Sequence, residues 1–241
     1  AIINSNFIKL FNFFCPGPIT FILKINPKSK ISTIATARKK TIAIRFPKHR
    51  VVRKLLNLLK MPLAAPSANI SSKLSPTSAS DVAEEFKNKI KFILDGGKSK
   101  IGLESTIVDL TNKPKVLRPG IITPDKISKI LNKETKVGKS TKRIRSPGQL
   151  KLHYSPGIPL KMNKESSNKN EAFVVFGKKF KGNKNCFNLS KNGNLKEAAK
   201  NLYTILRKIK RKGYKSIAVS KIPNVGIGIA INDRLKRASN K

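Results

Sequence analysis

The sequence predicts an α/β protein whose C-terminal part is a small parallel α/β layer. Short apolar runs beside Pro or Gly alternate with amphipathic segments along the 241 residues, which indicates strands and helices in turn. After residue 158 the order is strand, helix, strand and helix, which is typical of helices packed on a parallel sheet. At 39% hydrophobic residues, the chain has enough apolar material to form its cores.

The first part of the chain opens with a predicted helix at residues 5–14, where phenylalanines recur at helical spacing before a Pro-Gly-Pro sequence. Residues 63–65 are expected to form a short buried strand. The other expected strands span residues 19–25, 41–46, 90–94, 105–110 and 115–117. Three further helices are expected: one at residues 51–60, one at about residues 77–89, and one that begins after a cap at Thr123. The helix at about 77–89 is capped by Thr77 or Ser78 and carries Asp81, Glu84 and Glu85 in its early turns.

Three regions follow from this pattern. Residues 1–137 form the first domain, residues 138–157 form a basic linker, and residues 158–241 form the C-terminal α/β domain. The linker contains no acidic residue and carries two Ser-Pro-Gly sequences, which favour an extended segment lying over the first domain. In the C-terminal domain, strands are expected at 172–176, 186–189 and 217–219, and helices at 195–212 and 227–238.

The composition excludes several classes of protein. Two cysteines and two histidines are too few for a disulfide scaffold or a Cys-rich zinc site. No uninterrupted apolar run of about 18 residues is present, so we expect no membrane span. The apolar opening is broken by Lys9, Asn12 and prolines, so it does not resemble a signal peptide, and we expect a cytoplasmic protein.

The net charge of +40, from 52 basic and 12 acidic residues, raises the alternative of a non-catalytic basic protein that binds RNA, including tRNA or double-stranded RNA. The positive charge is spread along the whole chain, however, and 41 Lys stand against 11 Arg. Because Lys shares A/T-rich codons with the abundant Ile and Asn, a compositional bias explains much of the charge. RNA affinity from such a surface is expected to be loose and to weaken with salt.

Polar residues follow several of the predicted strands, where ligands of α/β proteins collect. A basic loop holds Arg45 and His49, and Arg can grip a phosphate through two hydrogen bonds. The segment from residue 62 to 77 holds Ala65, Ser67, Asn69 and Ser75, the region around residues 104–118 holds Ser105 and Arg118, and the linker holds His153 and Tyr154.

Each of these clusters also has a plainer interpretation. The loop with Arg45 and His49 could simply face solvent, and the segment from residue 62 to 77 could be a polar turn before a helix cap. In the region around residues 104–118, Glu104 could merely form an ion pair with Arg118. The aromatic pair could close over a site as a lid or could equally anchor the linker by packing. The sequence contains no P-loop, no GxGxxG before a helix and no arrangement typical of a Ser-His-Asp triad.

Taken together, the order and spacing of these motifs resemble the YrdC-like threonylcarbamoyl-AMP synthases, in the long form with an extra C-terminal domain. The motifs are Cys15-Pro16-Gly17-Pro18-Ile19-Thr20, Arg45-Phe46-Pro47-Lys48-His49, residues 62–69 with Ser75-Pro76-Thr77, Asp95-Gly96-Gly97, residues 104–110, Leu117-Arg118-Pro119-Gly120, Ser146-Pro147-Gly148 with His153-Tyr154-Ser155-Pro156, and Asn232-Asp233-Arg234-Leu235. The resemblance covers nearly the whole chain. It implies a YrdC-like twisted open mixed sheet with helices at residues 1–137 and a small Rossmann-like parallel domain after the linker.

The resemblance also implies an activity. Such enzymes condense L-threonine, bicarbonate and ATP, with Mg²⁺, into threonylcarbamoyl-AMP and pyrophosphate. The product serves the t6A modification at position 37 of tRNA through downstream transferase proteins. By this resemblance, ATP is contacted by Arg45, Ala65, Ser67, Asn69, Ser75, Arg118 and His153 or Tyr154. Threonine is held by His49 and Ser105. No covalent nucleophile is implied, since Arg45 and Arg118 would act by positioning and charge; no protein ligand for the metal is identified.

The sequence departs from the family pattern at three places. Cys15 stands where an aromatic residue is usual, and Ser72 stands where glycine is usual. The chain starts with Ala, and the family's N-terminal threonine-contacting segment and Lys-x-Arg motif have no counterpart in it. We therefore expect a fragment that holds half a site and has little activity.

Overall fold

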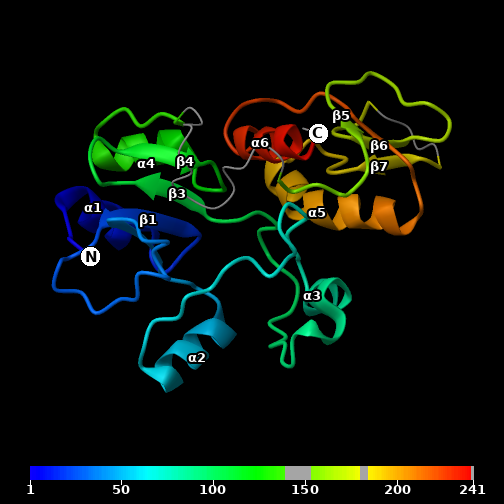
Figure 1. Ribbon diagram of the computed structural model, residues 1–241. Helices are drawn as coiled ribbons and strands as arrows, with labels where there is room; N and C mark the ends of the chain where they lie inside the picture. The colour runs from blue at the N-terminus through cyan, green and yellow to red at the C-terminus, as the bar shows by residue number, and fades with distance from the viewer. Residues whose placement is uncertain (139–152, 180–183, 240–241) are drawn as a thin grey trace. The chain divides into compact units, whose positions relative to one another are not determined.

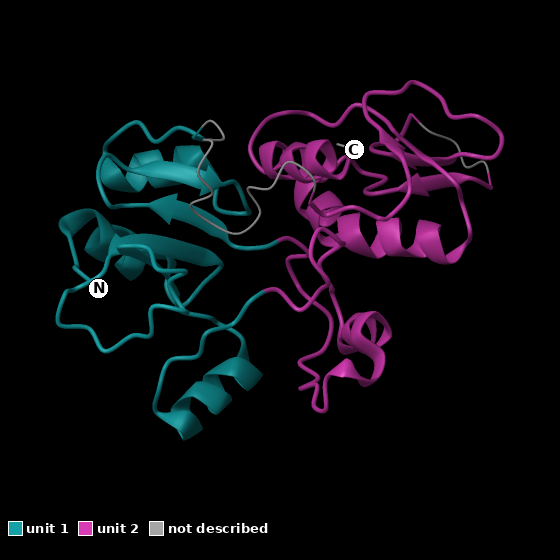
Figure 2. Cartoon of the chain, viewed as in Figure 1, with its two compact units in different colours: residues 1–66, 104–149 teal, residues 67–103, 150–241 magenta. Residues whose placement is uncertain are grey.

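The computed structural model describes residues 1–138, 153–179 and 184–239, so the predicted linker lies mostly outside the described residues, with its Ser146-Pro147-Gly148 motif. The chain divides into two compact units, which Figure 2 colours separately. Unit 1 comprises Ala1–Pro66 and Glu104–Gln149, and unit 2 comprises Ser67–Leu103 and Leu150–Lys241. These units follow contacts between residues, whereas the predicted domains follow the order of the sequence. The boundaries at 137 and 158 therefore stay a prediction.

Unit 1 is built on a four-stranded mixed sheet in the order β2-β1-β3-β4. The strands are β1 (Ile19–Lys24), β2 (Thr41–Arg45), β3 (Thr106–Asp109) and β4 (Lys115–Arg118). The central pair, β1 and β3, is parallel, and each edge strand runs antiparallel to its neighbour. The mixed sheet expected for the first domain is confirmed.

Two helices of unit 1 contact each other and share a core with this sheet: α1 (Ser5–Phe14) and α4 (Pro124–Leu131). Each begins at a side chain that caps its first turn, since Asn4 accepts from the backbone N–H of Phe7 and Thr123 from that of Lys126. Phe7 of α1, Phe21 of β1 and Ile127 of α4 meet in one apolar cluster. Figure 1 shows both helices beside the sheet.

Unit 2 is built on a four-stranded parallel sheet in the order β5-β8-β6-β7. The strands are β5 (Leu160–Lys161), β6 (Ala172–Val175), β7 (Cys186–Asn188) and β8 (Ile217–Val219), and the helices are α5 (Leu195–Arg211) and α6 (Gly228–Ser239). Most of the apolar stripe of α5, including Leu202 and Ile209, is buried in the core of this unit, and Leu195 and Ile205 are partly buried against it. The small parallel α/β layer predicted from the sequence is confirmed, with β5 as an additional short strand.

Part of the expected first domain packs in unit 2. The segment from Ser67 to Leu103 contains α3 (Ala79–Phe86) and the 3-10 turn η1 (Lys87–Lys89), and its Leu74 and Leu103 join the core formed around α5. The segment passes very close to α5 at Gly102. A Cβ atom there would lie 2.5 Å from the Cα atom of Lys200, and the φ angle of +79° also favours glycine.

Two expected strands are absent from the described structure. Residues 63–65 and 90–94 are exposed and have no strand assignment, so the expectation of a buried strand at 63–65 is wrong. A strand needs a neighbour that satisfies its N–H and C=O groups, and no described strand pairs with either segment. Helix α2 (Arg50–Leu59) has the expected amphipathic pattern, yet none of its residues is buried. No helix among the described residues is long and apolar enough to cross a membrane.

Candidate functional site

The sheet of unit 1 places two of the predicted site residues, Arg45 and Arg118, in one row. Arg45 pairs with Thr20 on β1, Thr20 pairs with Ile107 on β3, and Ile107 pairs with Arg118 on β4. The two arginines therefore belong to the two edge strands of the same sheet. The fold brings these residues together although 73 positions of sequence separate them.

Ser105, another predicted site residue, directly precedes β3 and is held from both sides. Its hydroxyl is 2.7 Å from the hydroxyl of Thr20. Arg118 donates from Nε to the carbonyl oxygen of Ser105 and from Nη2 to its hydroxyl, both at 3.1 Å. Ser105 is 3% exposed and Arg118 is 9% exposed, so this cluster is buried and its geometry is fixed by hydrogen bonds.

Electrostatic repulsion links the two arginines. The pKa of the Arg45 guanidinium is lowered, first by desolvation and then by the positive charge of Arg118. Among the described residues no ion pair joins Arg45 or Arg118 to a carboxylate. Two neighbouring cations with no counterion among the described residues favour an anionic ligand such as a phosphate or a carboxylate.

A close backbone contact fixes the turn after Arg118. The Thr106 hydroxyl donates to the carbonyl oxygen of Ile122 at 2.8 Å and lies against Gly120. A Cβ atom at position 120 would be 2.6 Å from that hydroxyl, so a larger residue would displace the turn. The Arg-Pro-Gly motif therefore has a packing reason: glycine lets the chain close behind Arg118.

Arg45 is itself an exposed residue, and the remaining predicted residues of unit 1 are exposed as well. His49 is the residue before the first turn of α2, and Ala65 lies in the extended segment that follows this helix. An exposed histidine at a helix start remains accessible to a small ligand. The threonine role predicted for His49 and the nucleotide role predicted for Ala65 stay predictions.

In unit 2, Asn69 organises the loop that follows the Pro-Ser-Ala sequence. Its Nδ2 atom donates to the carbonyl oxygens of Ile70 at 2.8 Å and Lys73 at 3.2 Å. Its Oδ1 atom is buried and has no hydrogen-bond partner among the described residues, so an acceptor remains for a ligand. Ser75 is also buried, at 8% exposure, and Ser67 is exposed.

The aromatic pair of the linker packs into unit 2. Tyr154 is 1% exposed, its ring stacks on Tyr203 with 5.9 Å between centroids, and the guanidinium of Arg234 lies 5.1 Å from its ring centroid. The backbone N–H of His153 donates to the carbonyl oxygen of Arg237 at 3.3 Å. This geometry favours the packing interpretation of the pair, and its lid role stays a prediction.

Sequence reasoning did not single out Thr20 or Arg207. Thr20 ends the Cys-Pro-Gly-Pro-Ile-Thr motif and was interpreted as a residue of a buried strand. Arg207 falls beside the apolar stripe of α5, where a cation is normally exposed. The available signal was its residue type: arginine is rare in this lysine-rich chain, and Arg207 and Arg211 are spaced four apart on one helix.

No metal centre is formed by the described part of the chain. Within residues 1–138, 153–179 and 184–239, no group of three or more His, Cys, Asp or Glu side chains is arranged to hold a metal ion. Both cysteines are free thiols. The polar groups described above instead suit an anionic ligand.

Two family models match adjacent parts of the chain. The Sua5–YciO–YrdC model, whose description is telomere recombination, matches residues 2–120. The model described as the C-terminal domain of threonylcarbamoyl-AMP synthase matches residues 122–240. Together the two matches extend over nearly all of the sequence.

Relatives with the name threonylcarbamoyl-AMP synthase resemble the chain over most of its length. The Pyrococcus abyssi protein is 37% identical, and the alignment covers 94% of this chain and 71% of the relative. The Bacillus subtilis protein is 32% identical, with coverages of 94% and 70%.

Solved structures give the same result. A crystal structure of P. abyssi Sua5 complexed with L-threonine matches with a TM-score of 0.87 at 33% identity, covering 99% of this chain and 75% of that chain. A second P. abyssi Sua5 structure, in which one histidine and one tyrosine are replaced by alanine, matches with a TM-score of 0.85 at 34% identity. It covers 99% of this chain and 74% of that chain.

Proposed function

Because the chain belongs to the threonylcarbamoyl-AMP synthase family, we propose that it forms threonylcarbamoyl-AMP and pyrophosphate from L-threonine, bicarbonate and ATP. The relatives reported above carry the name of this activity, and one matched structure contains L-threonine. None of them is named as an RNA-binding protein. The enzyme function is therefore better supported than a non-catalytic RNA-binding function.

The observation that carries the proposal is the buried cluster of Thr20, Ser105 and Arg118. It combines two hydroxyls with a guanidinium at hydrogen-bond distance, and Arg45 adds a second positive charge in the same row of the sheet. Hydroxyls with a cation suit an amino acid, and two cations suit the phosphates of a nucleotide. In this proposal Ser105 and His49 hold threonine, and Arg45 and Arg118 hold the nucleotide.

The chemistry that these residues would serve needs no covalent nucleophile on the protein. The amine of threonine attacks the carbon of bicarbonate, and loss of water gives a carbamate. A carbamate oxygen then attacks the α-phosphorus of ATP, the bond to the bridging oxygen breaks, and pyrophosphate leaves. The protein would contribute by holding the two reactants in line and by stabilising negative charge with Arg45 and Arg118.

The nucleotide contacts proposed in unit 2 are Ser67, Asn69, Ser75 and the His153–Tyr154 pair, with Ala65 from unit 1. The buried Oδ1 atom of Asn69, which has no partner in the described structure, supports a role as a ligand acceptor. The buried position of Ser75 requires a precise loop conformation around it.

Magnesium would enter this reaction with ATP. The described residues do not form a metal site of their own, so they do not fit a resident metal ion, and no step is assigned to one. Mg²⁺ is commonly bound through the phosphates of its substrate with few protein ligands. Downstream transferase proteins would use the adenylate to modify tRNA, and a cytoplasmic location fits that role.

Pyrophosphate release provides the test. The chain is incubated with ATP, Mg²⁺ and bicarbonate, with and without L-threonine, and the adenylate is identified by mass spectrometry. We expect release that depends on threonine and falls in the Ser67→Ala, Arg118→Ala double variant. Release that is independent of threonine contradicts the proposal, and so does an absence of release both from this chain and from the chain extended upstream.

A further inference from the structure

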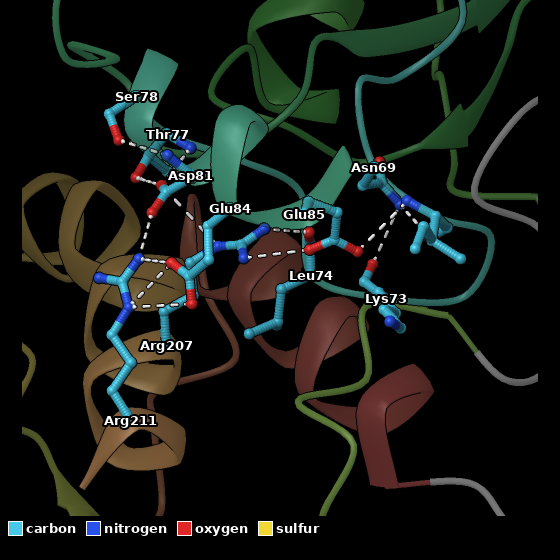
Figure 3. Close-up of polar contacts among 11 residues, drawn as sticks. Asn69, Lys73, Leu74, Thr77, Ser78, Asp81, Glu84, Glu85, Arg207 and Arg211 are labelled. Carbon is cyan, nitrogen blue, oxygen red and sulfur yellow. Dashed lines mark hydrogen bonds and ion pairs between the residues drawn. The ribbon is translucent and has the colours of Figure 1, made fainter. Parts of the chain in front are cut away.

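A buried arginine in the part of the chain that matches the C-terminal family model, residues 122–240, holds a loop in the part that matches the first family model, residues 2–120. Arg207 lies on α5 and is 9% exposed. Its Nη2 atom donates to the carbonyl oxygen of Leu74 at 2.6 Å, and its Nη1 atom donates to the Glu85 carboxylate at 3.3 Å. Its Nε atom lies 3.8 Å from the Asp81 carboxylate. Figure 3 shows Arg207 directed from α5 toward α3 and this loop.

The two carboxylates that face Arg207 hold the loop at both ends. Oδ2 of Asp81 accepts from the backbone N–H of Thr77 at 2.9 Å and from its hydroxyl at 3.0 Å. Oε1 of Glu85 accepts from the backbone N–H of Ile70 at 3.3 Å. Arg207 therefore binds the loop directly at Leu74 and fixes the carboxylates that bind it at Ile70 and Thr77.

Arg211 forms the outer part of the same network. It binds the Asp81 carboxylate at 3.1 Å and also contacts Glu84, but its side chain is half exposed. Burial alone would raise the pKa of Asp81. Hydrogen bonds from Thr77, the charge of Arg207 and a hydrogen bond from Arg211 outweigh that effect and lower the pKa. Asp81 is thus ionised at neutral pH and paired with both cations.

The chemistry of this position requires arginine. A guanidinium presents several N–H donors in a rigid plane and can bind a carbonyl and two carboxylates at once, whereas an ammonium is a point charge on a flexible stem. Lysine supplies most of the positive charge of this chain, so an arginine at a buried position of α5 marks a site where geometry matters.

The clamped loop carries residues that the proposed function assigns to the nucleotide. Asn69 directly precedes Ile70, and Ser75 directly follows Leu74. Resting on that proposed function, we propose that Arg207 is a positioning residue for ATP: the C-terminal domain, through α5, sets the conformation in which Asn69 and Ser75 meet the nucleotide. The threonine contacts proposed in unit 1 do not depend on this loop.

The test compares ATP and L-threonine binding separately, by calorimetric titration of the full chain. Arg207→Lys keeps a positive charge beside Asp81 and Glu85 and so preserves the fold, but one ammonium cannot also hold Leu74. Arg207→Met removes the cation altogether. Lys208→Gln, at the next and exposed position of α5, is the matched control for loss of one charge. Circular dichroism and the unfolding midpoint confirm that each variant is folded under the titration conditions.

We expect Arg207→Lys to raise the Kd for ATP about tenfold and to leave the Kd for threonine within about twofold of the wild-type value. Lys208→Gln should leave both unchanged. Wild-type ATP affinity in folded Arg207→Lys overturns the proposal, as does an equal loss of both ligands, which would indicate general structural damage. A wild-type chain that binds neither ligand would instead contradict the proposed function.

Discussion

Arg118 holds Ser105 by two hydrogen bonds, one to its carbonyl oxygen and one to its hydroxyl, each at 3.1 Å. The same hydroxyl is 2.7 Å from that of Thr20 on the neighbouring strand. Three residues that are distant in sequence therefore share one buried polar cluster. Because a buried polar group left without its partner is costly, each of them should be sensitive to substitution.

Thr20→Val should weaken threonine binding with little change of shape. The substitution keeps the side-chain volume and removes the hydroxyl beside Ser105, which frees the Ser105 hydroxyl to turn away from its present direction. We expect the KM for threonine to rise about tenfold and the free energy of unfolding to fall by about 1–3 kcal/mol. Initial rates and urea titrations measure the two effects. Thr41→Val, on the adjacent strand β2, is the control and should change neither.

Arg118→Lys should lower turnover although it conserves charge. Lysine cannot donate to both oxygens of Ser105 while also facing an anionic ligand, because it lacks the planar fork of arginine. We expect pyrophosphate release to fall by at least about tenfold in a folded protein. The measurement is threonine-dependent pyrophosphate release with the unfolding midpoint determined in parallel. Unchanged release would remove Arg118 from the proposed site.

Acid should weaken the contact between α3 and α5. The folded pKa of Asp81 lies below its ordinary value of about 3.9. Its ionised form therefore stabilises the fold above that pH, and the contribution is lost as the pH falls further, through the folded pKa. Urea titrations from neutral pH into this acidic range should show wild type and Asp81→Asn converging in stability. Asp125→Asn, an exposed position in α4, is the control, and a constant difference for Asp81→Asn would contradict the assignment.

Two substitutions of Tyr154 separate packing from ligand contact. Tyr154→Ala empties a fully buried site between Tyr203 and Arg234, and should cost about 3–5 kcal/mol of stability. Tyr154→Phe keeps the ring and should leave stability and ATP affinity close to the wild-type values if the residue only anchors the linker. Loss of ATP affinity in stable Tyr154→Phe would instead support direct contact of the hydroxyl with the nucleotide.

Cys15 should react slowly with thiol reagents. Burial raises the pKa of its thiol to about 11. Near pH 8 only about one molecule in a thousand then carries the reactive thiolate. We expect modification of Cys15 by an aromatic disulfide reagent to be much slower in the native chain than in concentrated urea, with the site identified by peptide mass spectrometry. Equal rates in the two conditions would show that the thiol is not shielded.

Local sequence signals predicted most of the secondary structure. The helix at Ser5–Phe14 follows from apolar spacing, and Ser78 and Thr123 cap the helices that the sequence assigned to them. The parallel pairing of β6 with β8 follows from the helix α5 that lies between them in the chain, whereas no helix separates β6 from β7. The strands predicted at residues 63–65 and 90–94 are absent, because a strand depends on a pairing partner that an apolar run in the sequence does not reveal.

The candidate site was predictable only in part for a similar reason. Motifs identified Arg45, Ser105 and Arg118, and the strand register then placed the two arginines in one row. Thr20 became visible only once its hydroxyl was seen beside Ser105. The role of Arg207 depends on a contact with Leu74 across 133 residues, and no local pattern in the sequence encodes such a contact.

The 133 residues between Leu74 and Arg207 also determine the order in which these contacts can form during synthesis. A ribosome that adds about 5–20 residues per second needs roughly ten seconds to go from Leu74 to Arg207. During that interval Asp81 and Glu85 have been made but their cation has not, so α3 and the loop before it cannot reach their final packing. The part of the nascent chain that matches the first family model therefore completes its packing only after α5 has emerged. A truncation between the two matched regions would leave Asp81 and Glu85 without the cation of Arg207.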